Sequence, residues 1–141
     1  AGDILPAPEL VVGDLSFISL TLVLPALVSV AAPDADFLLM VKPQFEIGKD
    51  RLGSGGVVRN LDHHRETITQ VIDSARGLGL GIAAVQASPL PGPSGNVEYF
   101  VSMRANHPEA LEDSQISEAI QKAIDEGPAG RGVGTHMHKD A

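Results

Sequence analysis

The sequence predicts an α/β domain whose sheet is mostly parallel and whose last strand runs antiparallel. Short apolar runs at 9–15, 37–42 and 80–87 are typical of buried strands. Segments with helical periodicity separate these runs, and such alternation of strand and helix favours a parallel sheet. No helix separates the third strand from a fourth at 97–104, so we expect the fourth strand to run antiparallel or at a sheet edge.

The first predicted helix follows the first strand. Pro25 is compatible with this helix only near its first turn, where the amide hydrogens lack intrahelical partners. The segment "AAPDAD" at 31–36 ends the helix, and "FLLMVK" begins the second strand directly after it. The apolar residues that recur at helical spacing are Leu20, Val23, Leu24, Leu27 and Val28.

Two further helices are predicted. One lies after the glycine-rich segment "IGKDRLGSGGVVRN"; Asn60 or Asp62 can cap its start, and Gly77 or Gly79 can end it. The last helix ends at "GP", residues 127–128, and we expect one domain over 1–128 with a flexible tail at 129–141. The apolar positions of the two helices are Ile68, Val71, Ile72 and Ala75, and Ile116, Ala119, Ile120, Ala123 and Ile124.

The composition indicates one ordinary globular domain. Of the 141 residues, 43% are hydrophobic and 20% charged, which is enough apolar material for a single core. With no cysteine, disulfides and thiolate metal sites are excluded. The start "AGDILPAPEL" has no basic segment followed by an apolar one, and the longest apolar run is too short to span a bilayer. We therefore expect a cytoplasmic protein, without a membrane span or a metal site.

The charge is unevenly distributed. The net charge of −8 disfavours a general nucleic-acid binder, which normally carries a basic face. Between residues 42 and 59, however, four bases outnumber two acids, whereas six acids meet one lysine between residues 109 and 126. An anionic partner is therefore expected to meet the middle of the chain.

Three ionisable residues are expected at one rim of the sheet. Asp14 follows the first strand, Lys42 ends the second, and Glu98 begins the antiparallel fourth. Ligands of open parallel sheets bind beyond the carboxyl ends of the strands, where all three residues would lie. A lysine between two carboxylates is suited to proton transfer. Each of these residues alone is more often a solvated charge at a strand end. With three of them at one rim, a structural role and a catalytic role are equally expected.

Three long segments resemble one known family. They are "VVGDLSFISLTLVLPAL", "LLMVKPQFEIGKDRLGSGGVVRN" and "ASPLPGPSGNVEYF". They resemble the TlyA family, known as hemolysins and as ribosomal RNA 2′-O-methyltransferases, which is related to the FtsJ-like RNA methyltransferases. The resemblance covers about residues 9–128. It implies a Rossmann-like fold, S-adenosylmethionine as methyl donor, and ribosomal RNA or a ribosomal subunit, not DNA, as partner.

The resemblance also implies roles for individual residues. The related enzymes use a Lys-Asp-Lys-Glu tetrad, in which Asp14 resembles the aspartate, Lys42 the second lysine and Glu98 the glutamate. Asp14 would also border the methyl group, and Phe17 would lie against the cofactor. The residues expected to contact the RNA substrate or to line its rim are Phe45, Lys49, Arg51, Arg59, Ser94 and Asn96.

The match to the family is partial. The first lysine of the tetrad, the glycine-rich cofactor loop and a small RNA-binding domain would all lie upstream of Ala1. The chain is therefore expected to carry the C-terminal part of the methyltransferase domain, with most of the cofactor pocket elsewhere, and to be inactive alone. Its first strand would expose an apolar edge that favours self-association. A non-catalytic α/β binding module and membrane lysis are the alternative functions.

Overall fold

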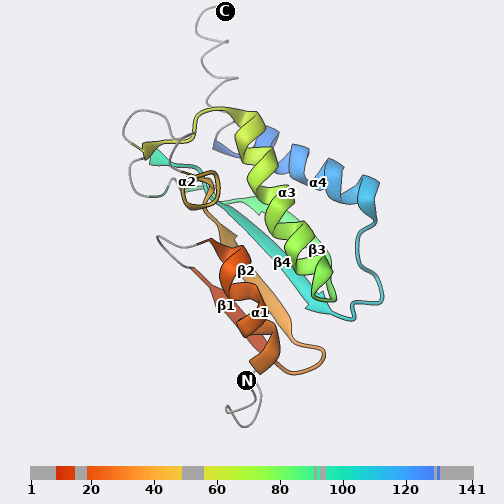
Figure 1. Ribbon diagram of the computed structural model, residues 1–141. Coiled ribbons are helices and arrows are strands. Elements are labelled where there is room, and N and C mark those ends of the chain that lie inside the picture. Colours follow the sequence, from red (N-terminus) through yellow and green to blue (C-terminus); the bar gives the residue numbers. More distant parts are fainter. Residues whose placement is uncertain are drawn as a thin grey trace, which may run out of the picture.

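The computed structural model describes residues 9–14, 19–48, 56–90, 92, 95–128 and 130 (Figure 1). One helix separates β1 from β2 and two helices separate β2 from β3, whereas the last two strands follow one another directly. The elements are β1 (Leu10–Gly13), α1 (Leu20–Val30), β2 (Asp36–Val41), α2 (Pro43–Glu46), α3 (Leu61–Gly77), β3 (Leu80–Ala87), β4 (Tyr99–Ala105) and α4 (Asp113–Glu126). The expected α/β class is confirmed.

The four strands form one sheet in the order β1-β2-β4-β3. β1 and β2 are parallel, whereas β4 is antiparallel to both of its neighbours, β2 and β3. Three strands thus share one direction and the last runs against them, as the missing helix between β3 and β4 indicated. Of the two places considered for the fourth strand, the edge is wrong: β4 lies inside the sheet, because it pairs with β3 on one side and with β2 on the other.

The register of the strands fixes which residues meet at the rim. Gly13 of β1 pairs with Leu39, and Val41 at the end of β2 pairs with Tyr99 at the start of β4. Because β4 is antiparallel, its first residue lies at the same edge of the sheet as the last residues of β1 and β2. The segments that continue beyond this edge carry the predicted site.

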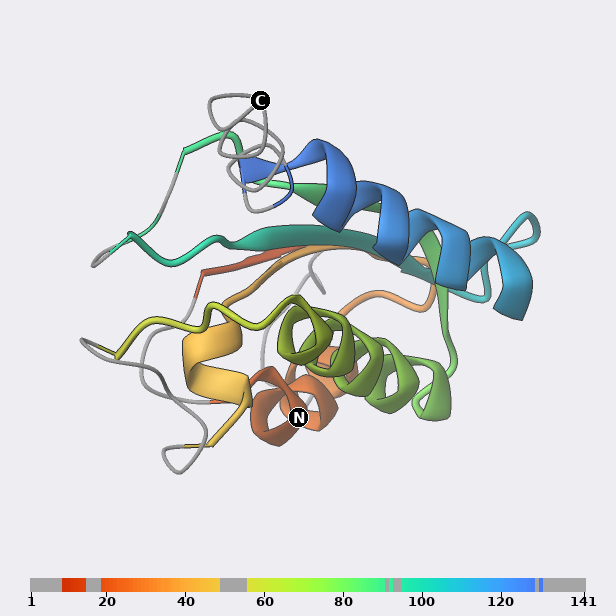
Figure 2. The ribbon, with the colours of Figure 1, turned by 90° about the horizontal axis from the view of Figure 1, so that it is seen from above.

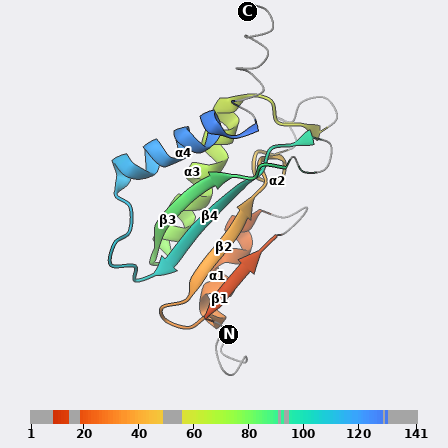
Figure 3. The same cartoon turned by 180° about the vertical axis from the view of Figure 1, so that it is seen from behind.

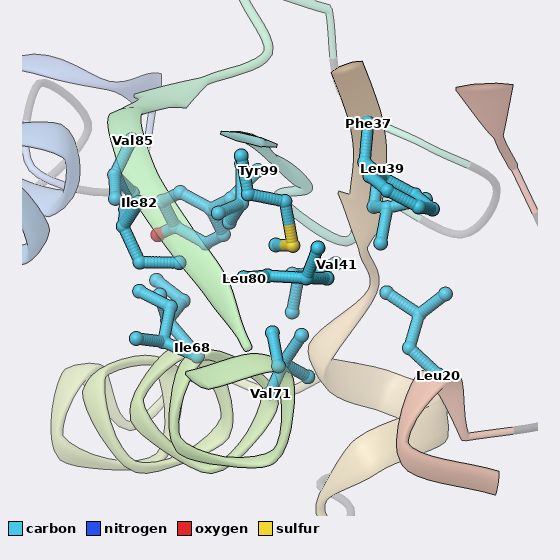
Figure 4. Packing of buried hydrophobic residues seen from close by; sticks show 14 of the residues in the cluster. Leu20, Phe37, Leu39, Val41, Ile68, Val71, Leu80, Ile82, Val85 and Tyr99 are labelled. Carbon is cyan, nitrogen blue, oxygen red and sulfur yellow. The ribbon is translucent and has the colours of Figure 1, made fainter. Parts of the chain in front are cut away.

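The helices are distributed unevenly over the sheet. Figure 2 shows α1, α2 and α3 on one side, while α4 lies along β3 and also contacts α3, for example through the bond of Arg65 to Ser117. Alternate residues of the strands face α1 and α3 and are buried, as Figure 4 shows for Leu39, Val41 and Tyr99 opposite Ile68 and Val71. This alternation is the period-two pattern of a strand with one covered face.

The other face of the sheet carries no helix of the described chain over β1, β2 and β4 (Figure 3). In the part of the chain that the structure describes, β1 pairs only with β2 and forms one edge of the sheet. Leu10 and Val12 on this strand are 61% and 65% exposed. The predicted apolar edge is therefore present.

The helix ends follow the sequence signals in α3. The side chain of Asn60 accepts a hydrogen bond from the backbone N–H of Asp62, so Asn60 is the N-cap. After the helix, Gly79 adopts a positive φ of 89°, which an L side chain rarely adopts. The short helix α2 was not expected, since four residues are too few to show a helical period.

The expectation for Pro25 was wrong. Pro25 lies inside α1, five residues after Leu20, and not in the first turn. It is exposed, so the carbonyl group that loses its helical donor can bond to water instead.

Candidate active site

The centre of the rim is an ion pair between Lys42 and Asp14. The Lys42 Nζ atom lies 2.5 Å from Asp14 Oδ1; the lysine side chain is 10% exposed and the aspartate 61%. Gly13 brings the two strands close, because a Cβ at this position would lie 2.8 Å from the Leu39 side chain. The two charged residues thus meet because β1 and β2 are adjacent, parallel and end at the same edge.

Glu98 lies at the start of β4 and is nearly enclosed. Its side chain is buried, with the residue 6% exposed, and its backbone carbonyl accepts a hydrogen bond of 2.8 Å from the Ser88 N–H. A Cβ at Gly92 would overlap the Glu98 carboxyl group. Gly92, the first glycine in "PLPGPSGN", is therefore needed so that the backbone can lie against this carboxylate.

Gln44 joins the second strand to Glu98. It lies in α2, two residues after Lys42, and its Nε2 atom donates a hydrogen bond of 3.2 Å to Glu98 Oε2. The Gln44 Oε1 atom is buried and has no donor within the described residues. The sequence reasoning did not identify Gln44, although its place in "VKPQFE" beside Lys42 was the available signal.

Glu46 fixes α2 against the start of α1. Ser19 Oγ donates to Glu46 Oε1 at 2.5 Å, and the backbone N–H of Leu20 donates to Oε2 at 2.8 Å. A carboxylate is favourable at a helix N-terminus, where amide hydrogens lack partners. Burial raises the pKa of Glu46, and the two hydrogen bonds oppose that rise. This contact joins the segment after β1 to the segment after Lys42.

Asn96 holds the loop that precedes α3. Its Oδ1 atom accepts from the Val58 N–H and its Nδ2 atom donates to the Gly56 carbonyl, each at 2.9 Å. The residue is only 3% exposed. These bonds give Asn96 a role in positioning the loop, and its expected contact with the substrate stays a prediction.

His64 ties the same loop to β4. Its Nε2 atom lies 2.8 Å from the Val58 carbonyl oxygen, which can only accept, so Nε2 carries the proton. The other ring nitrogen, Nδ1, then accepts from the Tyr99 hydroxyl at 2.6 Å. Burial lowers the pKa of His64 and raises that of Tyr99. The neutral imidazole therefore anchors the residue next to Glu98.

The remaining predicted residues are placed only in part. Phe45 in α2 is partly buried beside the rim segment, and Arg59 is exposed before α3. The other four predicted residues lie outside the described residues, namely Phe17, Lys49, Arg51 and Ser94. In the described part of the chain, no group of three or more metal-binding side chains is gathered, and none of the helices found there could cross a membrane.

Comparison with known proteins decides the family. A family model described as FtsJ-like methyltransferase matches residues 3–105. The chain belongs to the FtsJ-like methyltransferase family. The resemblance on which the rim residues were assigned is thereby confirmed at the level of the family.

Individual relatives agree with this assignment. Over 120 residues the chain is 51% identical to the 16S/23S rRNA (cytidine-2'-O)-methyltransferase TlyA of Mycobacterium tuberculosis, and the match covers 85% of this chain and 45% of that protein. It is 28% identical over 93 residues to Hemolysin A of Brachyspira hyodysenteriae, with 66% of this chain and 39% of that protein covered. The FtsJ-like chain thus spans less than half the length of these relatives.

A solved structure is similar in fold. The crystal structure of "a putative hemolysin from Lactococcus lactis" superposes with a TM-score of 0.75 at 32% identity, and the match covers 84% of this chain and 57% of that one. The FtsJ-like fold is therefore shared with proteins that carry the hemolysin name.

Proposed function

We propose that this FtsJ-like domain serves S-adenosylmethionine-dependent methyl transfer to a ribose 2′-hydroxyl of ribosomal RNA. The observation that carries the proposal is the rim at which Lys42 pairs with Asp14 while Glu98 lies at the start of the adjacent strand. The relative that is 51% identical is named for this reaction. The protein would act in the cytoplasm, where ribosomal RNA is found.

Each rim residue has a different role in the transfer of one proton. Lys42 orients the ribose 2′-hydroxyl and takes its proton as the oxygen attacks the methyl group. Asp14, which lies 2.5 Å from the Lys42 Nζ atom, holds the lysine in place and balances the charge of the ammonium that forms. Glu98 closes the other side of the rim and is held in place by Gln44. Holding the reacting hydroxyl in line supplies much of the rate enhancement.

S-adenosylmethionine supplies a methyl group already activated on a positively charged sulfur. The donor set of the rim fits such a group, since Asp14 presents a carboxylate that is 61% exposed at the end of β1. Phe17, three residues further along, is the side chain proposed to lie against the cofactor. Residues of the rim would thus border the methyl-transfer side of the bound donor.

Several residues of the middle segment would meet the RNA. Phe45 is proposed to stack on a base, and Lys49, Arg51 and Arg59 to contact phosphates, because basic side chains position an RNA backbone. Ser94 and Asn96 belong to the loop that borders Glu98. The excess of bases between residues 42 and 59 supports this arrangement.

The experiment compares Lys42→Ala with wild type in the protein expressed from the complete reading frame. Ribosomal subunits are incubated with methyl-labelled S-adenosylmethionine, and the RNA is then hydrolysed in alkali, which does not cleave beside a 2′-O-methyl group. We expect labelled, alkali-resistant dinucleotides with wild type and with the exposed control Lys122→Ala, but not with Lys42→Ala. Calorimetry checks that the variant still binds the cofactor. Undiminished methylation by Lys42→Ala would refute the assignment.

The name of one relative, Hemolysin A, favours membrane lysis as a second candidate. The last helix argues against it, because α4 exposes several carboxylates and would be repelled by an anionic bilayer. Release of dye from phosphatidylcholine–phosphatidylglycerol vesicles by the protein would support lysis. Retention of the dye, together with labelled ribose, would leave methyl transfer as the activity.

A further inference from the structure

The position of Gln44 in the rim is unfavourable for stability, because one of its polar atoms is buried without a hydrogen-bond partner among the described residues. Its amide group bonds to Glu98 through Nε2, while the amide oxygen Oε1 is buried without a donor in the described part of the chain. Buried acceptors without a donor are uncommon, and a chain selected for stability alone would place an apolar side chain there. A residue that keeps such a group is therefore expected to serve the site.

The orientation of the amide follows from Glu98. Only the NH₂ group of Gln44 can donate to a carboxylate; the reversed amide would place its oxygen against Glu98 Oε2, which is also an acceptor. The bond to Glu98 thus forces the amide oxygen to face away from the carboxylate, into the protein. The unpaired oxygen is the consequence of holding the carboxylate.

Two restraints then act on the Glu98 side chain. The backbone at Gly92 lies against its carboxyl group, and the amide of Gln44 bonds to one carboxylate oxygen. Because Gln44 follows Lys42 by two residues in the same short segment, it couples the placement of Glu98 to that of the lysine. A displacement of either strand end would be transmitted to the other.

We propose that Gln44 is a positioning residue that holds the carboxylate of Glu98 in register with Lys42 for the methyl-transfer reaction. The inference rests on the proposed function and assigns a further residue to it. Gln44 acts through Glu98, so its loss lowers the rate of the chemical step and leaves binding of the methyl donor intact.

The first test is Gln44→Met, which keeps the length of the side chain and removes both polar atoms. In the protein from the complete reading frame we expect kcat for labelled methyl transfer to fall about 10-fold or more, with the KM for S-adenosylmethionine unchanged. The unfolding midpoint of the variant should stay close to that of wild type, because loss of the bond to Glu98 is offset by removal of the unpaired oxygen. Gln70→Met, on the exposed surface of α3, is the matched control.

The second test is Gln44→Glu, which places two carboxyl groups side by side. Two adjacent carboxylates resist ionising together, so a shared proton keeps Glu98 in place at low pH and its loss drives the two apart at high pH. The rate of Gln44→Glu relative to wild type should therefore fall as the pH rises. Its unfolding midpoint relative to that of wild type should also fall as the pH rises. This measurement tests the contact between residues 44 and 98 independently of the reaction.

The outcomes separate the two proposals. An active wild type with equally active Gln44→Met overturns the role of Gln44 alone. A parallel loss of stability and activity in Gln44→Met, or a Gln44→Glu variant whose relative rate and midpoint do not change with pH, also overturns it. Wild type that leaves the RNA unmethylated overturns the proposed function, and the part of Gln44 in that reaction with it.

Discussion

The Nζ atom of Lys42 lies 2.5 Å from Oδ1 of Asp14, although the aspartate is exposed and the lysine is almost enclosed. An ion pair with one partner in solvent contributes little to stability, because water screens the charge and the side chain loses freedom. Stabilising the fold and orienting Lys42 for the proposed reaction are two explanations of the pair. The two explanations predict different results for a variant.

Asp14→Asn should separate activity from stability. The free energy of unfolding should change by less than about 1 kcal/mol, because the Asp14 carboxylate is 61% exposed and water screens its charge. Methyl transfer by the protein from the complete reading frame should fall at least about 10-fold, because Lys42 loses the charge that orients it. Urea unfolding and labelled methyl incorporation measure the two quantities. Asp73→Asn, on the exposed side of α3, is the control; equal activity of both variants would contradict the prediction.

Gly92→Ala should disturb Glu98 selectively. The added methyl group would overlap the Glu98 carboxyl group, so the carboxylate must shift and the protein should lose about 1–3 kcal/mol of stability. Gly95→Ala is the matched control in the same loop, since its φ of 83° makes it strained while its Cβ would meet nothing within 4 Å. Thermal unfolding should show both losses, whereas only Gly92→Ala should lower kcat. A similar kcat for the two variants would argue against a role for the Glu98 position.

His64 should make stability depend on pH in a defined direction. Burial holds its pKa in the folded protein below the usual value of about 6.5, so the unfolded chain binds more protons as the pH falls through that value. The free energy of unfolding contributed by His64 is thus fully present above about pH 6.5 and decreases below it. His64→Gln should be less stable by about 1–3 kcal/mol at pH 7.5 and should show a flatter profile between about pH 5.5 and 7.5. Chemical unfolding at several pH values measures the slope. An unchanged slope in His64→Gln would disprove the assignment.

The exposed edge of β1 should support self-association. Leu10 and Val12 are exposed on a strand that pairs on one side only within the described chain, and such edges recruit further strands. Light scattering of the 141-residue chain should detect association that Val12→Lys reduces, because a lysine on the edge disfavours pairing. Leu22→Lys removes a similarly exposed apolar side chain from α1, away from the edge. If both variants reduce association equally, general apolar exposure and not the edge is responsible.

The sequence predicted the site residues whose positions follow from the order and direction of the strands. Asp14, Lys42 and Glu98 stand at strand ends, and the absence of a helix between β3 and β4 was enough to bring Glu98 to the same rim. The family resemblance then named the reaction. The first three strands were predictable from their short continuous apolar runs, and the three long helices because their apolar residues recur with a period of about 3.6.

The parts that were missed depend on contacts between distant loops. Gln44 lies in a helix of four residues, too short for periodicity to indicate its face. His64 was not predicted as a site residue, because its contact with Tyr99, 35 residues away in the sequence, follows from no local pattern. The part of Asn96 in holding residues 56–58 follows from hydrogen bonds that no local pattern encodes.

The interior position of β4 has a consequence for the order of folding. This strand is the last of the four in sequence, yet it lies between β2 and β3. The pairings of β2 with β4 and of β3 with β4 can therefore form only after β4 has been synthesised. The bond between Arg104 and Asp36, 68 residues apart, is one of those late contacts. A nascent chain that ends before residue 98 can pair β1 with β2 and so hold Lys42 beside Asp14, but it does not yet contain Glu98 or the strand that follows it. The rim is completed only when its last strand is inserted.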